Sequence, residues 1–158
     1  MRSAAVPPLL RCGAWAVAAG RVELGLTALA RPSVPARPWV GAAADEVAVR
    51  VFGRALGARD LALGLGALSA LHGVAAEPES ACAWVAAGAL ADALDVTASL
   101  ASWGELPPRG RWLVVAAAGG AAVTGAAGAL VLYVDRAASP GALAASRTLR
   151  LAGPLSGR

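Results

Sequence analysis

The chain has 158 residues, of which 58% are hydrophobic and 15% charged, and its formal net charge is +4. A soluble domain normally carries about a quarter charged residues, so this composition argues against an ordinary soluble globular protein. Its basic side chains are arginines scattered at segment ends and in loops, without interleaved aromatic residues. That distribution argues against a nucleic-acid-binding patch and favours contacts with lipid headgroups.

Four apolar segments follow one another along the chain, and proline or glycine lies between them, where helices are expected to end. Each segment is close to the ~20 residues that cross ~30 Å of hydrocarbon as an α-helix. We therefore predict an all-α fold, a four-helix transmembrane bundle forming one domain over residues 1–136, with spans at about 11–30, 57–75, 80–102 and 111–134. An alanine-rich soluble helical bundle is the alternative, because alanine dominates these segments and is only weakly hydrophobic.

The connection between the first two spans is too long for a simple loop. Pro32, Pro35 and Pro38 are expected to keep its start extended. Asp45 is expected to cap an amphipathic lead-in helix that lies near the membrane interface and runs into the second span. At the other end of the chain, residues 137–158 are rich in alanine, serine, glycine, proline and arginine, which predicts a disordered tail.

Aromatic residues mark the ends of the predicted spans. If the helices alternate in direction, the aromatic residues at one face are Trp15, Trp84 and Tyr133, and those at the other are Trp39, Trp103 and Trp112. Two such belts are typical of membrane proteins. The arginines divide almost evenly between the two faces, so the positive-inside rule assigns no firm orientation.

Ionisable residues inside the predicted spans are the strongest functional signal. A charge at mid-span costs ~2.5–3.5 kcal/mol on insertion scales, so such residues are expected to pair inside the bundle. In the third span, Asp92 and Asp95 share a stripe with Trp84, Gly88 and Ser99, because residues three and four apart lie on one helix face. The predicted intramembrane polar cluster, a candidate ligand or proton site, consists of Arg21, Glu23, Arg59, Asp60, Asp92 and Asp95.

Depth along the spans predicts which of these charges meet. Arg21 and Asp92 both lie about nine or ten residues from the same face, or ~14 Å deep at 1.5 Å per residue, and should form a pair. Arg59 begins near that face and is expected to reach inward toward Asp95. Asp60 and Glu23 are then left for hydrogen bonds or for protonated forms.

Small residues should let the helices approach closely. Gly53, Gly57 and Gly64 lie on one face of the second span, and Gly120 and Gly128 are available for packing on the fourth. Glycine faces of this kind also suit a second copy of the chain or a subunit of a membrane complex.

No complete catalytic constellation is found, so we do not predict an enzyme, a cofactor or a metal site. The Asp92 and Asp95 pair matches only a fragment of aspartate-rich magnesium motifs, which need several carboxylates on one face. His72 is the one histidine and lies at a helix end. Cys12 and Cys82 are too few for a disulfide framework or a metal centre.

Three stretches of the sequence together resemble a known group. They are Gly20 and Arg21 with Gly25 and Pro32, then Gly57 to Gly66 with its Arg-Asp pair, then Gly88 to Asp95. This arrangement, over about residues 10–134, is similar to a family of small uncharacterised four-helix bacterial integral membrane proteins, a domain of unknown function, and more distantly to DoxX-like proteins. The resemblance implies an integral membrane bundle without an assigned activity.

We therefore expect a multi-pass integral protein of the cell membrane, with the lipid bilayer as its main partner and no nucleic-acid binding. In this interpretation the Arg/Asp network is mainly structural. Two alternatives remain, a small proton-coupled transporter of a small solute and an accessory subunit of a membrane complex. A dry, fully paired interior would favour the structural role, and a wet cavity around Asp92 would favour a binding site.

Overall fold

A computed structural model describes residues 8–73 and 78–137, and within these ranges the regular structure is entirely helical, as predicted. The elements in chain order are α1 (Pro8–Ala30), α2 (Ser33–Val40), the short 3-10 helix η1 (Gly41–Asp45), α3 (Val47–His72), α4 (Pro78–Ala101) and α5 (Pro108–Ala137). The predicted disordered tail lies outside the described residues except for Ala137, which ends α5.

The four long helices correspond to the four apolar segments, with ends set by proline and glycine. Pro8, Pro78 and Pro108 each begin a helix, where a missing backbone N–H leaves no hydrogen bond unmade. At the other end of α3, the N–H of Gly73 donates to the carbonyl of Ser69. α3 starts ten residues before the predicted second span. The predicted lead-in helix and the predicted span therefore form one continuous helix.

The prediction that Asp45 caps this helix is wrong. Glu46 occupies the N-cap position and makes no side-chain capping hydrogen bond. The Asp45 carboxylate instead accepts a hydrogen bond of 2.6 Å from Arg37, on the exposed surface. The Asp45 carboxylate thus pairs with Arg37, eight residues earlier, and does not cap the start of α3.

The prediction of an extended, proline-rich start to this connection is also wrong, because Ser33–Val40 forms α2. Pro32 is the N-cap residue and Pro35 lies in the first turn, where backbone N–H groups have no partner within the helix. The ring of proline holds φ near −65°, which is a helical value. Gly41 then ends α2 with φ of 67°, a left-handed conformation that glycine adopts without strain.

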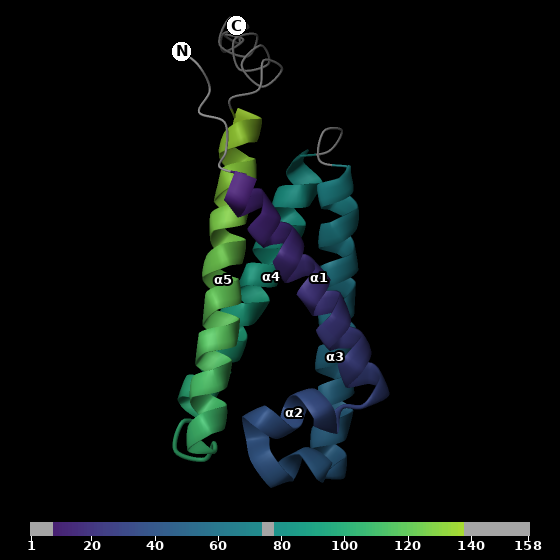
Figure 1. The fold of residues 1–158 in the computed structure, drawn as a ribbon, viewed down its shortest axis with the longest axis vertical. Helices are drawn as coiled ribbons and strands as arrows, with labels where there is room; N and C mark the ends of the chain where they lie inside the picture. The colour runs from purple at the N-terminus through teal and green to yellow at the C-terminus, as the bar shows by residue number, and fades with distance from the viewer. Residues whose placement is uncertain (1–7, 74–77, 138–158) are drawn as a thin grey trace, which may run out of the picture.

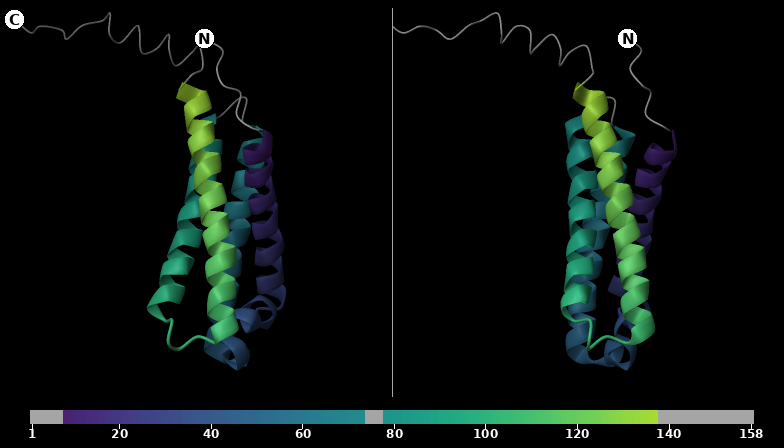
Figure 2. Two further views of the ribbon diagram at one scale, coloured as in Figure 1. Left: turned by 60° about the vertical axis from the view of Figure 1, so that its left-hand side comes forward. Right: turned by 90° about the vertical axis from the view of Figure 1, so that its left-hand side faces the viewer.

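The long helices form two pairs, α1 along α3 and α4 along α5. Figure 1 shows α1 running obliquely from a start beside α5 to an end beside α3, and Figure 2 shows all four helices following the same long axis. Glycines bring α1 and α3 together: a Cβ on Gly57 would lie 2.7 Å from Ala28 Cβ, and one on Gly64 would lie 2.8 Å from the Ala18 carbonyl oxygen. This close approach is the packing that the glycine spacing predicts.

All four long helices meet at the end of the bundle where α1 and α4 begin. Side chains from each helix form an apolar core there, consisting of Ala14, Ala18, Ala67, Leu71, Ala81, Val85, Ala129 and Leu132. We call this region the closed end. Toward the opposite end, which we call the open end, the two helix pairs separate and α2 lies across the gap between them (Figure 1).

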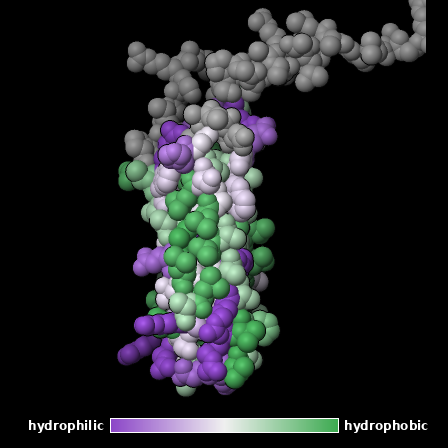
Figure 3. Space-filling view, turned by 90° about the vertical axis from the view of Figure 1, so that its right-hand side faces the viewer, coloured by the Kyte–Doolittle hydropathy of each residue, from purple (hydrophilic) through white to green (hydrophobic). Residues whose placement is uncertain are grey.

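Two of the long helices, at Glu79–Ala101 and Pro108–Ala137, are long and apolar enough to cross a membrane. In the 18-residue apolar stretch of each helix, only 33% of the first and 17% of the second is buried within the protein. Much of this hydrophobic surface therefore faces outward. Length and composition thus support two of the four predicted spans. α1 carries Arg11, Arg21 and Glu23, and α3 carries Arg50, Arg54, Arg59 and Asp60, and neither helix meets the length and hydropathy of a candidate span. In Figure 3 hydrophobic residues dominate the middle of one face and hydrophilic residues gather below them.

Candidate functional site

Arg21 of α1 lies at the centre of a buried charge network that connects three helices. Its Nη1 donates a 2.8 Å hydrogen bond to Asp60 Oδ1 of α3. Its Nη2 donates to the Gly88 carbonyl oxygen of α4 and lies 2.5 Å from Asp92 Oδ2, forming an ion pair. The absence of a Cβ on Gly88 makes room for the guanidinium, whose Nε would lie 3.2 Å from such an atom. The predicted Arg21–Asp92 pair is therefore confirmed.

Arg59 of α3 forms the second half of the network. Its Nη1 and Nη2 donate to Asp95 Oδ1 and Oδ2 of α4 at 3.0 and 2.7 Å, a two-pronged contact that matches the planar guanidinium to the carboxylate. The predicted pairing of Arg59 with Asp95 is also confirmed. The Arg59 side chain is 31% exposed, against 7% for Arg21, so the two halves of the network lie in different surroundings.

Asp60 joins the two halves, which the sequence reasoning did not predict. One of its oxygens, Oδ1, accepts hydrogen bonds from both Arg21 and Arg59, at 2.8 and 3.2 Å. Asp60 is thus the bridge of the network rather than a residue left over from pairing. It lies on the side of α3 that faces α1, together with Gly57 and Gly64, each of which is buried.

Glu23 is not part of this cluster. Two residues after Arg21, it lies about 200° further around the helix, and its side chain is exposed on the outer face of α1. Its backbone carbonyl accepts a hydrogen bond from the Thr27 hydroxyl. Of the six predicted cluster residues, the structure therefore brings five together and places Glu23 outside.

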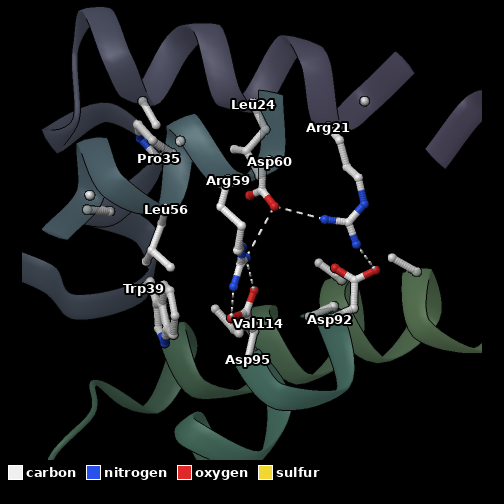
Figure 4. A pocket seen from close by; sticks show the side chains of 18 of the residues that line it. Arg21, Leu24, Pro35, Trp39, Leu56, Arg59, Asp60, Asp92, Asp95 and Val114 are labelled. Carbon is white, nitrogen blue, oxygen red and sulfur yellow. Dashed lines mark hydrogen bonds and ion pairs between the residues drawn. The ribbon is translucent and has the colours of Figure 1, made fainter. Parts of the chain in front are cut away.

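A half-open cavity of about 560 Å³ adjoins the network on the side of the open end. All five clustered charges line it, and the rest of its wall is apolar (Figure 4). That apolar wall includes Leu24 and Ala28 of α1, Pro35 and Trp39 of α2, Leu56 of α3, and Leu113, Val114 and Ala118 of α5. Its volume falls within the ~300–1,000 Å³ typical of small-molecule sites.

Trp39 is the cavity residue that sequence reasoning assigned to another role. Its placement in an aromatic belt was predicted from its position near a span end, but its ring lines the cavity beside Leu56 (Figure 4). Gly110, the third residue of α5, holds it there: a Cβ on Gly110 would lie 2.2 Å from the Trp39 carbonyl oxygen. The first turn of α5 and the last turn of α2 therefore meet backbone against backbone at the open end.

The site can therefore offer both charge and apolar surface to a small molecule. Three carboxylates and two guanidiniums give the lining residues a formal charge of −1 when all are ionised. The carboxylates are separated by guanidiniums rather than converging on one point, and among the described residues no group of three or more histidine, cysteine, aspartate or glutamate side chains is placed to hold a metal ion. Comparison of the chain with protein-family models, with curated proteins and with solved structures found no match.

Proposed function

We propose that this chain is a four-span membrane protein that binds a small, largely apolar solute in the cavity between its two helix pairs. The observation that carries the proposal is the cavity of about 560 Å³ against the charge network. A network that served only to join helices would be enclosed by packing on all sides. Here Asp95 and Arg59 remain 23% and 31% exposed beside the cavity, where a solute can reach them.

Exposed apolar side chains support membrane insertion of α1 and α3 as well as of α4 and α5. Leu26 of α1 is 53% exposed, and Leu65 of α3 is 52% exposed. These large side chains lie on the same helices that carry the network, and they would contact lipid in a membrane bundle. Near the middle of these helices, Arg21, Arg59 and Asp60 are turned inward and paired, whereas Glu23 is exposed. Arg11 and Arg54 are also exposed and lie nearer the helix N-termini, so the pairing satisfies three of the more central charges.

The network then has a second role beside forming the polar wall. Alanine packing alone gives little cohesion within lipid, where there is no hydrophobic force between helices. Arg21 and Arg59 supply interhelical contacts from α1 and α3 to α4 that lipid cannot replace. This is the structural role predicted for the cluster.

The number of spans can be tested with single cysteines in a Cys12→Ala, Cys82→Ala background. Three exposed positions serve as reporters: Ala42 in η1, Gly73 after α3, and Gly104 between α4 and α5. In sealed vesicles labelled with a membrane-impermeant maleimide, four spans place Ala42→Cys on the same side as Gly104→Cys and opposite Gly73→Cys. If only α4 and α5 cross the membrane, Ala42→Cys labels together with Gly73→Cys instead.

Water access to the cavity can be tested on α5 in the same background. Ala118→Cys faces the cavity, whereas Ala116→Cys, two residues earlier, is exposed on another face at nearly the same depth. Thiols react with methanethiosulfonate ethylammonium as thiolates, which form in water and not in lipid. We expect Ala118→Cys to react about tenfold faster than Ala116→Cys. This ratio corresponds to a difference of ~1.4 kcal/mol in activation free energy. Equal rates would contradict a solvent-accessible binding cavity.

A further inference from the structure

The charge balance of the cavity indicates what kind of solute it accepts. Asp60, Asp92 and Asp95 contribute three negative charges, and Arg21 and Arg59 contribute two positive ones. Both guanidiniums already donate to carboxylates, so their charge is satisfied within the network. An anionic solute would add to the negative excess, whereas a monovalent cation would bring the site to neutrality.

The remainder of the wall is suited to the body of such a cation. The sections of α2 and α5 that line the cavity contribute only apolar side chains and the indole of Trp39. An aromatic face attracts a cation that lies over it, by ~0.5–2 kcal/mol, and this attraction is greatest for tryptophan. In Figure 4 the Trp39 ring appears on the same side of the site as Arg59 and Asp95, and all three residues line the same cavity.

We infer that the cavity binds a monovalent organic cation with an apolar body, whose charge offsets the unbalanced carboxylate of the Asp60, Asp92 and Asp95 group. This inference rests on the proposed binding function and names its ligand class. Asp95 is the carboxylate that the cation approaches, because it is the most exposed of the three. The buried pair of Arg21 with Asp92 stays intact behind it.

A proton can supply the same single positive charge, so the cation and the proton compete. The titratable groups facing the site are the three aspartates on α3 and α4 and the arginines on α1 and α3, while the lining residues of α2 and α5 include none. Acidification that protonates one carboxylate removes the negative excess. The affinity for a cation of fixed charge should therefore fall at low pH, approaching about tenfold per pH unit where one proton is exchanged.

The decisive experiment compares two probes of the same shape. Benzyltrimethylammonium carries a permanent positive charge, and neopentylbenzene replaces its nitrogen with carbon and is neutral. Binding to the purified full chain is measured by calorimetry in detergent, with empty micelles subtracted. We expect the cation to bind about tenfold more tightly than the neutral probe, a ratio within the range of one desolvated cation–π contact. Equal or stronger binding of neopentylbenzene overturns the inference, and so does failure of the cation to bind.

A matched pair of variants locates the charge that matters. Asp95→Asn removes one negative charge from the cavity and should abolish the preference for the cation and its pH dependence. Glu23→Gln removes one negative charge from the outer face of α1 and should leave both unchanged. A preference that survives in Asp95→Asn, or that disappears in Glu23→Gln, contradicts the assignment.

The outcomes also separate this inference from the proposed function. If Ala118→Cys reacts quickly but the neutral probe binds as well as the cation, the cavity is real and the cation specificity is wrong. If Ala118→Cys reacts no faster than Ala116→Cys, the binding function itself fails. The comparison of the two probes uses the unaltered chain, so it remains decisive even if Asp95→Asn does not fold.

Discussion

The closed and open ends of this bundle are built from the same four helices, yet they are packed very differently. At the closed end, alanines from all four long helices fill the interior, and the adjoining cavity measures only about 10 Å³. At the open end the helix pairs separate and leave a half-open cavity of about 560 Å³ between them. The smaller volume has room for about one water molecule, whereas the larger one can hold an organic molecule.

The charge network lies at the boundary between these two ends, and its halves reflect their surroundings. Arg21 lines both the small and the large cavity, and it is almost completely buried. Arg59 and Asp95 line only the large one and are more exposed. The comparison shows that one set of ion pairs can join the tightly packed end of a bundle and also form the polar wall of the cavity at its other end. Three substitutions test this division.

The largest effect is expected from Arg21→Gln, which leaves Asp60 and Asp92 without their buried partner. Removing one member of a buried ion pair costs ~3–5 kcal/mol, because the remaining charge is uncompensated. The measurement is the free energy of unfolding in detergent, with the exposed Arg109→Gln as control. The double variant Arg21→Gln, Asp92→Asn should be more stable than Arg21→Gln alone. Equal stability of the single and double variants would show that the pair is not energetically coupled.

Arg59→Gln should destabilise the protein less, by ~1.5–3 kcal/mol, the range for hydrogen bonds to charged groups. Its partner Asp95 is 23% exposed beside the cavity, so its carboxylate is less dependent on the guanidinium than a fully buried one. The same unfolding measurement applies. A loss as large as that of Arg21→Gln would mean that the two halves of the network share one environment, contrary to the structure.

A third variant disturbs the Arg21 half without changing any charge. In Gly88→Leu the new side chain enters the space of the Arg21 guanidinium, and overpacking of this kind costs ~1–3 kcal/mol. Gly120→Leu on α5 is the matched control, because a Cβ there has no neighbour within 4 Å. We expect a lower unfolding midpoint for Gly88→Leu only. Similar midpoints for both leucine variants would contradict the close packing of Arg21 on Gly88.

Much of the network could be predicted from the sequence because helix geometry fixes both depth and face. Arg21 and Asp92 lie at matching depths, and Asp92 and Asp95 follow the three- and four-residue spacing of a single face. Asp60 accepts hydrogen bonds, as predicted, but its bridging of the two arginines was not predicted. It lies one residue after Arg59, about 100° further around α3, and only the position of α1 shows that both guanidiniums reach it.

The features that could not be predicted depend on how the helices are placed relative to one another. The cavity results from the separation of two helix pairs, which no residue pattern within a single helix specifies. α2 was missed because its prolines were read as helix breakers, although Pro35 lies in a first turn where proline is tolerated. Glu23 was included because it is charged and central in α1, but its angular position directs it outward.

The contact between α2 and α5 has a consequence for the evolution of proteins built like this one. The backbones of Trp39 and Gly110 meet at the open end, so the chain between α1 and α3 contacts α5 at the place where the helix pairs stand apart. Insertions or deletions in residues 31–46 would widen or narrow the cavity while leaving its charged wall untouched. Related chains could then accept molecules of different size by changing one connection, with the recognition chemistry inherited unaltered.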